Sequence, residues 1–338
     1  MKYSIIIPVY NRPEEVGELL DSLIHQTISD FEVIVVEDGS TLSCEQVCNH
    51  YQGRLDLHYF RKENSGPGQS RNEGARQAKG TYLIILDSDV TLPPGYLQAV
   101  NKELDREPAD AFGGPDRASA SFTPLQKAIS ISMTSFFTTG GIRGGKKKLD
   151  KFYPRSFNMG VRREVYQNLG GFSHMRFGED IDFSIRIYQN HYHCRLFPEA
   201  WVWHKRRTNF RKFWKQVFNS GIARINLYKK YPESLKIVHL LPAAFTTGVI
   251  GLLLLCLIGF LTKCRLLIWI PLLPLAAYYL LILADGWRAS HSFRIGILAG
   301  IAAYVQLTGY GCGFLKAWWQ RCICKKGEFA AYQNTFYK

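Results

Sequence analysis

The sequence predicts an α/β domain with a mostly parallel central sheet, followed by C-terminal transmembrane helices. Short, β-branched apolar runs alternate with helical segments through the first part of the chain, which is typical of a doubly wound sheet. Polar and acidic residues directly follow several of these runs. The last third contains apolar stretches with the roughly 20 residues that a bilayer span requires.

The first predicted strand covers Tyr3 to Val9, and a helix is expected from about Pro13 to Gln26. A second strand covers Phe31 to Val36 and leads into the polar segment Glu37 to Ser40. Ligands of open α/β sheets bind beyond the carboxyl ends of the strands. We therefore expect the loop at Pro8 to Arg12, the segment Glu37 to Ser40 and the residues Asp87 to Asp89 to converge on one site of nucleotide size.

Further helices are expected at Cys44 to Tyr51 and Ser70 to Ala78, and the apolar run that ends at Leu86 is a buried strand. Asp87 and Asp89 follow it. Alternate residues of a strand share a face, so these carboxylates should point the same way and suit Mg²⁺ or Mn²⁺. By itself this pattern is more often a turn or a helix cap, so its meaning depends on its surroundings.

Two other nucleotide-binding classes are disfavoured. The segment Gly66 to Arg71 imitates the start of the dinucleotide fingerprint, but Arg71 stands where the third glycine belongs. No Gly-x-x-x-x-Gly-Lys-Ser/Thr sequence occurs. The chain therefore lacks the phosphate-binding loops of dehydrogenases and of P-loop ATPases.

Over roughly residues 3 to 210 the chain resembles the family 2 glycosyltransferases, which are inverting enzymes of the GT-A fold. The segments that carry the resemblance are Ile7 to Asn11, Val36 to Ser40, Gly68 to Ala75, Leu86 to Asp89 and Gly178 to Asp182. One departure is Glu37, where the family often has an aspartate. The resemblance implies a nucleotide-sugar donor (a UDP- or GDP-sugar) and Mn²⁺ or Mg²⁺ as the cofactor.

The same resemblance assigns residues to the nucleoside of the donor. Asp38 is expected to accept a hydrogen bond from an N–H group of the base. Pro8, Tyr10 and Arg71 are expected to frame the nucleoside. For Pro8 and Tyr10, simple loop packing explains the residues equally well.

The metal and the diphosphate have a second set of expected residues. Asp89 should bind the metal directly, and Asp87 should hold the ribose or a water near the metal. His204 follows a short strand and is a further metal ligand, while Arg206 meets the pyrophosphate because a guanidinium binds phosphate oxygens in pairs. The bound metal would neutralise the leaving diphosphate.

An inverting enzyme also needs a base close to the acceptor hydroxyl, and Asp180 is the candidate. It lies where a loop enters a helix, so capping of that helix is a competing interpretation. Glu179 and Asp182 are expected to orient the base or to contact the acceptor. Asn158, in a strand-then-helix segment, is expected to bind sugar hydroxyls of the acceptor.

Three apolar stretches follow the catalytic segments. Ile237 to Leu261 and Leu266 to Ala284 are predicted spans, whereas Phe293 to Leu315 contains several glycines and polar residues and either spans or lies in the interface. Basic residues before the first span place the catalytic domain in the cytoplasm. Charge favours two spans and apolar length favours three, so both alternatives stay open.

The net charge of +14 raises the question of nucleic-acid binding. The positive charge is concentrated in residues 143 to 151, in the segment before the first span and in the C-terminal tail. This distribution fits a surface of anionic membrane lipid, so we expect membrane lipid as a partner and no nucleic acid.

The predicted organisation is a catalytic domain at 1–231 (donor half about 1–115, acceptor half about 116–231), a membrane region at 237–315 and a basic tail at 316–338. The expected function is sugar transfer to a lipid-linked or glycan acceptor in cell-surface polysaccharide synthesis, at the inner membrane. A processive polysaccharide synthase is a weaker alternative, because no Gln-x-x-Arg-Trp sequence follows Asp180. A membrane protein that binds the nucleotide sugar without catalysis is a third.

Overall fold

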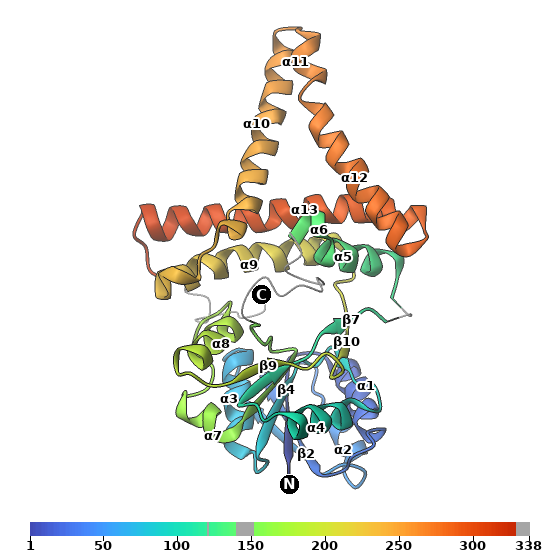
Figure 1. The fold of residues 1–338 in the computed structure, drawn as a ribbon, viewed down its shortest axis with the longest axis vertical. Coiled ribbons are helices and arrows are strands. Elements are labelled where there is room, and N and C mark those ends of the chain that lie inside the picture. The colour runs from blue at the N-terminus through green and yellow to red at the C-terminus, as the bar shows by residue number, and fades with distance from the viewer. Residues whose placement is uncertain (120–121, 140–151, 329–338) are drawn as a thin grey trace. The chain divides into compact units, whose positions relative to one another are not determined.

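A computed structural model of the chain describes residues 1–119, 122–139 and 152–328, and these residues form two units (Figure 1). Residues 1–119 and 152–205 form the sheet unit, and residues 122–139 and 206–328 form the helical unit. The basic segment 143–151, for which the sequence predicts lipid contact, lies outside the described residues.

The sheet unit is built on a seven-stranded sheet with the strand order β3-β2-β1-β4-β8-β6-β9. Its strands are β1 (Tyr3–Val9), β2 (Phe31–Asp38), β3 (Leu57–Lys62), β4 (Tyr82–Leu86), β6 (Ala111–Gly113), β8 (Asn158–Arg162) and β9 (Cys194–Leu196). The pairs β1–β2, β1–β4, β2–β3 and β6–β9 are parallel, and β8 runs antiparallel to β4 and β6. The predicted α/β class with a mostly parallel sheet is therefore confirmed.

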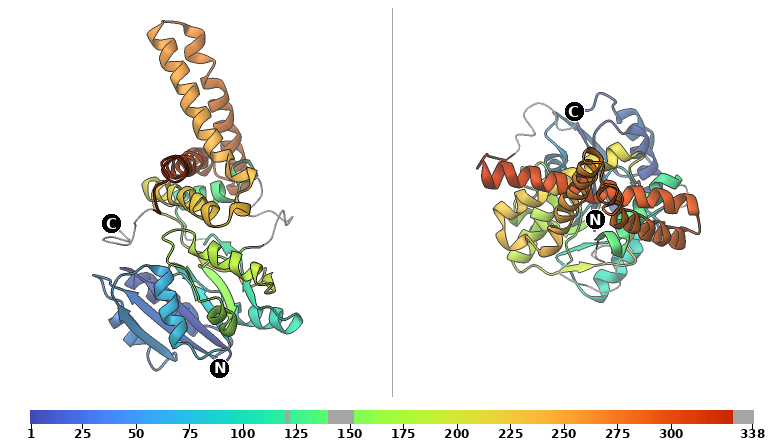
Figure 2. Two further views of the ribbon diagram at one scale, coloured as in Figure 1. Left: turned by 90° about the vertical axis from the view of Figure 1, so that its left-hand side faces the viewer. Right: turned by 90° about the horizontal axis from the view of Figure 1, so that it is seen from above.

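Helices cover both faces of this sheet, as the views in Figures 1 and 2 show. One hydrophobic core joins Ile5 and Ile7 of β1 to helices α1 (Pro13–Ile24), α2 (Glu45–Tyr51) and α4 (Tyr96–Arg106). The other joins Ile6 to helices α3 (Pro67–Gln77), α7 (Arg163–Asn168) and α8 (Glu179–Gln189). The alternation of β1 side chains between two cores follows from the two-residue period of a strand, and explains why its sequence is apolar at nearly every position.

A second, three-stranded sheet lies beyond the carboxyl end of β4. Its strands are β5 (Val90–Thr91), β10 (Val202–His204) and β7 (Asp116–Arg117), in the order β5-β10-β7. His204 pairs with Val90 in the antiparallel register of β10 and β5. This pairing brings a residue from the end of the sheet unit next to the Asp87–Asp89 turn.

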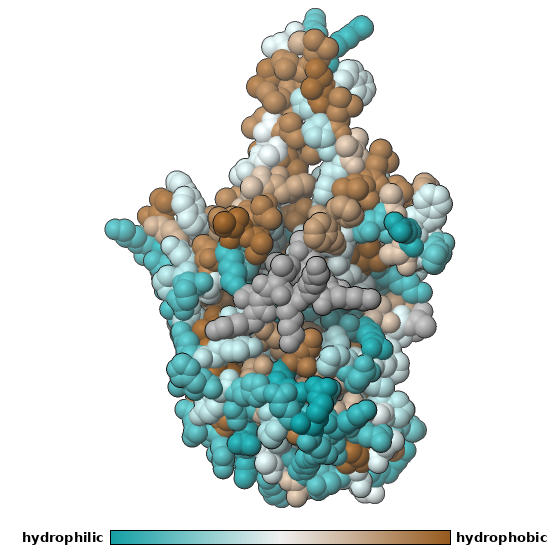
Figure 3. Space-filling model, viewed as in Figure 1, coloured by the Kyte–Doolittle hydropathy of each residue, from teal (hydrophilic) through white to brown (hydrophobic). Residues whose placement is uncertain are grey.

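The helical unit contains the remaining helices of the described chain. They are α5 (Pro124–Thr134), α6 (Phe136–Thr139), α9 (Phe210–Lys230), α10 (Leu241–Leu261), α11 (Arg265–Trp269), α12 (Leu272–Ser290) and α13 (Phe293–Trp318), with short turns η1 (Pro232–Ser234), η2 (Ile237–His239) and η3 (Trp319–Ile323). Helices α10 and α12 converge at α11, and α13 lies across their other ends alongside α9 (Figures 1 and 2). Apolar residues dominate the visible surface of α10 and α12 (Figure 3).

Three helical segments of the described chain are long and apolar enough to cross a membrane: Ile237–Leu261, Arg265–Ser290 and Phe293–Ile323. Only 11% of the apolar window is buried in each of the first two, against 50% in the third. Helix α9 belongs to the helical unit, whereas the sequence analysis placed it in the catalytic domain. Compactness does not establish which residues catalysis needs, so the catalytic boundary near residue 231 stays a prediction.

Candidate active site

Asp87, Asp89 and His204 form a cluster at the carboxyl end of β4. Each offers one ligand atom, and these atoms lie within 4.8 Å of one another. Strand alternation does not explain why the two aspartates lie close together, because β4 ends at Leu86, before both of them. They lie in the turn that joins β4 to β5, which is closed by a hydrogen bond from the Val90 N–H to the Asp87 carbonyl at 3.3 Å.

Asp89 is the buried centre of this cluster, with 8% of its side chain exposed. Its Oδ2 accepts a hydrogen bond from Arg12 at 2.7 Å, and its Oδ1 lies 3.3 Å from Nε2 of His204. The His204 ring stacks on Phe157 with ring centroids 4.9 Å apart, and its Nδ1 lies 3.9 Å from the carboxylate of Asp116. Two carboxylates and one imidazole form a donor set that fits a divalent cation.

Arg71 connects this cluster to helix α8. One Nη atom donates to Asp87 at 2.7 Å and the other donates to Glu179 at 3.1 Å. The Arg71 side chain is 4% exposed, and its guanidinium lies over the Phe172 ring, 5.2 Å from the ring centroid. A buried arginine between two carboxylates holds both in defined positions through charge-assisted hydrogen bonds.

Asp180 lies at the N-terminus of α8 and is held by Arg155, whose Nε donates to its Oδ2 at 2.6 Å. Its Oδ1 accepts from the N–H of Ile181 at 2.8 Å. Burial alone would raise the pKa of Asp180, but the charge and hydrogen bond of Arg155 outweigh burial and lower it below its ordinary value. Asp180 is therefore ionised at neutral pH.

Glu179, its neighbour, is affected in the opposite direction. Burial, followed by the negative charge of Asp180, raises the pKa of Glu179 to about 7. Arg71 lowers this pKa without cancelling the effect of burial. The adjacent carboxyl groups therefore titrate far apart, which is a common feature of sites that transfer protons.

Asn158 and Asp182 make only internal contacts among the hydrogen bonds of the described chain. Asn158 is 1% exposed; it accepts from the Tyr96 hydroxyl at 2.6 Å and donates to the Ala200 carbonyl at 2.8 Å. Asp182 is fully buried and pairs with Arg186 at 3.0 Å. Both side chains are therefore buried and hydrogen-bonded within the sheet unit, and their acceptor roles stay predictions.

Asp38 lies at the end of β2, where the sequence predicts it, and is 1% exposed. Its carboxylate accepts hydrogen bonds from Lys62 and from the N–H groups of Ser65 and Gly66. Lys62 ends β3, and Ser65 and Gly66 belong to the loop between β3 and α3, so Asp38 holds the start of that loop against β2. The predicted hydrogen bond to a nucleobase stays a prediction.

Three other residues that the sequence predicts to bind the donor are Pro8, Tyr10 and Arg206. Pro8 is buried in β1 opposite Val36, and Tyr10 follows the strand with a partly exposed side chain. Arg206 belongs to the helical unit, where its carbonyl accepts from Gln126 at 2.9 Å. For all three residues the predicted contact with the donor stays a prediction.

Two arginines of the site were not predicted from the sequence. Arg12 was recognised only as part of a loop, and Arg155 not at all. No local pattern reveals them, because each pairs with a carboxylate far away in the chain: Arg12 with Asp89, and Arg155 with Asp180.

Comparison with known proteins finds relatives of this chain. Residues 4–170 match the model of the family "Glycosyl transferase family 2". The chain is 28% identical over 239 residues to "Probable glycosyltransferase YdaM" of Bacillus subtilis, a match that covers 67% of this chain and 56% of that protein. It is 40% identical over 116 residues to the Staphylococcus aureus "Poly(ribitol-phosphate) beta-N-acetylglucosaminyltransferase TarS", covering 33% of this chain and 20% of that protein.

A solved structure extends the likeness of the fold along the chain. The mannosyltransferase PcManGT of Pyrobaculum calidifontis, solved in complex with GDP-Man and Mn²⁺, superposes with a TM-score of 0.58. The match covers 95% of this chain and 88% of that one at 17% sequence identity. At this identity the likeness concerns the fold.

Proposed function

Because the chain belongs to glycosyl transferase family 2 and has the GT-A α/β fold, we propose that it is an inverting glycosyltransferase. It moves a sugar from a nucleotide-sugar donor to a lipid-linked or glycan acceptor. The observation that carries this proposal is the position of Arg71, which contacts Asp87 of the candidate metal cluster and Glu179 beside the candidate base. One buried side chain thus links the donor side to the acceptor side.

On the donor side, Asp89 and His204 would hold Mn²⁺ or Mg²⁺, with Asp87 beside them. Bound there, the ion would supply Lewis-acid stabilisation of the diphosphate. Arg12 neutralises Asp89 and holds its Oδ2 at 2.7 Å, which keeps Oδ1 directed toward His204. A UDP- or GDP-sugar is the donor class, and PcManGT, with the same fold, is described in complex with GDP-Man and Mn²⁺.

On the acceptor side, Asp180 is the proposed base. It takes the proton of the acceptor hydroxyl as that oxygen bonds to the anomeric carbon, while the bond from this carbon to the diphosphate breaks. Attack opposite the leaving group inverts the configuration. Arg155 keeps Asp180 ionised and holds its Oδ2. Oδ1 accepts the Ile181 N–H and keeps a second lone pair that can receive the proton.

Glu179 is a second candidate for the base, favoured by one observation. Its pKa, raised to about 7 by burial and by the charge of Asp180, is close to the value at which general bases work best near neutral pH. In the described structure, however, Glu179 accepts a hydrogen bond from Arg71, which suits a positioning residue. We therefore assign proton transfer to Asp180 and positioning to Glu179.

A donor screen tests the activity, and two variants test the base. The screen measures Mn²⁺-dependent release of nucleoside diphosphate from several sugar nucleotides by membranes that contain the protein. Asp180→Asn should lower turnover by about 10²- to 10⁴-fold with donor affinity almost unchanged, whereas Glu179→Gln should retain more activity. Asp105→Asn, an exposed carboxylate on α4, is the matched control.

The outcomes separate the proposal from its alternatives. Wild-type turnover in Asp180→Asn would assign this residue to helix capping, since asparagine caps a helix about as well as aspartate. A larger loss in Glu179→Gln than in Asp180→Asn would move the base to Glu179. Donor binding without release would favour the non-catalytic protein, and a long polymer product would favour the processive synthase.

We also propose that helices α10 and α12 anchor the enzyme in the inner membrane as a two-helix hairpin, with the catalytic domain in the cytoplasm. The 21 residues of α10 rise about 31 Å, close to the thickness of the hydrocarbon core. Charged residues lie at both ends of the hairpin. Lys263 and Arg265 lie at the α11 turn, and Asp285 and Arg288 lie near the other end of α12.

Helix α13 has a different environment, which favours two spans over three. Half of its apolar window is buried inside the protein, because α13 packs along α9 and α5 and across the ends of α10 and α12 (Figures 1 and 2). Asp285 of α12 accepts a hydrogen bond from Ser135, beside α5, at 2.6 Å. We therefore assign α13 to the membrane interface, with the basic residues that follow it in the cytoplasm.

The relatives and the proposed anchor support one class of acceptor. A hairpin in the membrane would hold the enzyme next to lipid-linked acceptors, and TarS is named as an enzyme that glycosylates poly(ribitol-phosphate). We propose a surface polysaccharide or a related polymer intermediate as the acceptor of this chain.

A further inference from the structure

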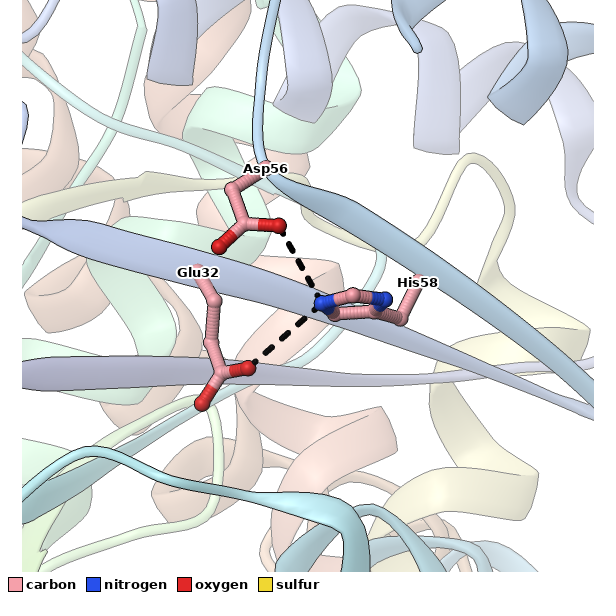
Figure 4. Close-up of side chains that lie close together, drawn as sticks. All are labelled: Glu32, Asp56 and His58. Carbon is pink, nitrogen blue, oxygen red and sulfur yellow. Dashed lines mark ion pairs between the residues drawn. The ribbon is translucent and has the colours of Figure 1, made fainter.

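A second group of metal-binding side chains lies at the opposite end of the main sheet. Glu32 is the second residue of β2, while Asp56 and His58 lie at the start of β3 (Figure 4). The ligand atoms of these three residues lie within 4.8 Å of one another. Glu32 and Asp38 are six residues apart on one strand, which separates this cluster from the carboxyl end of β2 by roughly 20 Å.

Glu32 is prepared to bind through one particular oxygen. Its side chain is 0% exposed, and its Oε1 accepts hydrogen bonds from the Ser4 hydroxyl at 2.6 Å and from the Lys79 N–H at 2.7 Å. Its Oε2 points to His58 (Figure 4) and accepts no hydrogen bond within the described residues. A buried carboxylate oxygen that accepts no hydrogen bond costs folding free energy. A ligand bound to this oxygen would remove that cost.

The distances around His58 suit a shared metal ion better than direct hydrogen bonds. Nε2 of His58 lies 3.2 Å from Oδ1 of Asp56 and 3.6 Å from Oε2 of Glu32, and it makes no hydrogen bond within the described chain. In a tetrahedral site with metal–ligand bonds of about 2.1 Å, ligand atoms are separated by about 3.4 Å. The two measured separations lie on either side of this value.

We propose that Glu32, Asp56 and His58 bind a Zn²⁺ ion that fastens the edge strand β3 to β2. One imidazole and two carboxylates are a donor set that zinc accepts, and a water completes the four-coordinate shell. Ser4 and Lys79 hold the Glu32 carboxylate in its orientation, as outer hydrogen bonds commonly do for metal ligands. Strand β3 is at the edge of the sheet, so a clamp at its start stabilises its register.

Zinc titration of the full chain in detergent tests the proposal. The parent protein and all its variants carry Asp89→Asn, which weakens ion binding at the candidate active site. Bound metal is first removed from each with EDTA. Zn²⁺ affinity and stoichiometry are then measured against a chromophoric chelator. Glu32→Gln keeps one side-chain oxygen as the acceptor for Ser4 and Lys79 and replaces only the oxygen that would bind the metal. Glu32→Gln and His58→Gln should each weaken Zn²⁺ binding at the proposed site at least tenfold.

The control is His193→Gln, which removes a surface imidazole whose Nε2 lies 3.6 Å from the carboxylate of Glu107. It should leave Zn²⁺ affinity unchanged. Melting temperatures, measured with and without Zn²⁺, show whether each variant is folded, and the rise caused by Zn²⁺ should be absent from Glu32→Gln. Equal Zn²⁺ affinity in the parent and in Glu32→Gln would overturn the proposal. So would a melting temperature of the parent protein that does not rise when Zn²⁺ is added.

Discussion

At the scale of single residues, the candidate site is organised by arginines that pair with carboxylates. Arg12 holds Asp89, Arg71 joins Asp87 to Glu179, and Arg155 holds Asp180. Each pair is at least partly buried, so the loss of one partner leaves a charge without compensation. The arginines therefore hold the acids in position, and Arg155 also keeps Asp180 ionised.

Arg71→Lys tests the connection between the two halves of the site. Lysine carries a compact charge and cannot reproduce the planar fork that contacts two carboxylates. We expect turnover to fall about 10- to 100-fold while the protein stays folded. Arg76→Lys, on the exposed side of the same helix, is the control. Unchanged turnover in Arg71→Lys would show that the connection is not needed for transfer.

Glu179 makes stability depend on pH in a predictable direction. Its ordinary pKa of 4.5 is raised to about 7 in the folded protein. A carboxyl with a raised folded pKa contributes its stability below pH 4.5 and loses that contribution as pH rises through 7. Glu179→Gln stays neutral, so it should be more stable than the wild type at pH 8 by about 1–3 kcal/mol and nearly equal at pH 4.5. Melting temperatures at the two pH values measure this, and a difference independent of pH would contradict it.

At the scale of elements, the sequence predicts the central strands best. Strands β1, β2 and β4 were predicted because they are continuous apolar runs, and α3 begins at Pro67, three residues before the expected Ser70. The edge strand β3 and the short strand β9 were missed, since β3 is only partly buried and β9 has three residues. His204 was predicted near the metal by family resemblance alone. Its pairing with Val90 spans more than 100 residues, which no local pattern contains.

The contact of α3 with β1 depends on Gly74. A Cβ at this position would lie 2.5 Å from Cγ2 of Ile6 and 3.4 Å from Cγ2 of Val36. Gly74→Ala should therefore destabilise the protein by about 1–3 kcal/mol through overpacking, although alanine favours a helix. Gly95→Ala is the control, because its Cβ would meet no atom within 4 Å. If both substitutions shifted the melting temperature equally, the close approach would not be tight.

At the scale of the whole molecule, the two units carry different parts of the proposed activity. The sheet unit contains the candidate metal cluster and the candidate base, and the helical unit contains every candidate span of the described chain. The presence of three apolar helices was predicted from length and hydropathy alone. The alternative between two and three spans was not resolved by the sequence, because the burial of α13 depends on contacts with helices α5 and α9.

Single-cysteine proteins test this topology in intact cells. A cysteine at exposed Thr262, beside the α11 turn, should react with a membrane-impermeant maleimide from outside. Native Cys324, exposed after α13, should react only after the inner membrane is permeabilised. Labelling of Cys324 from outside would indicate a third span, and protection of position 262 would indicate a hairpin that does not cross.

The packing of α5 against α13 has a consequence for biosynthesis. Ala128, Ile129 and Met133 of α5 are covered by α13 residues such as Ala299 and Ala302, yet the ribosome makes α13 about 160 residues after α5. At 5–20 residues per second this delay is roughly 10 to 30 s. During it the apolar face of α5 lacks its native cover, and the nearest apolar phase is the surface of the membrane. The exposed apolar face of α5 therefore favours binding of the nascent chain to the bilayer surface before either span of the hairpin has been translated.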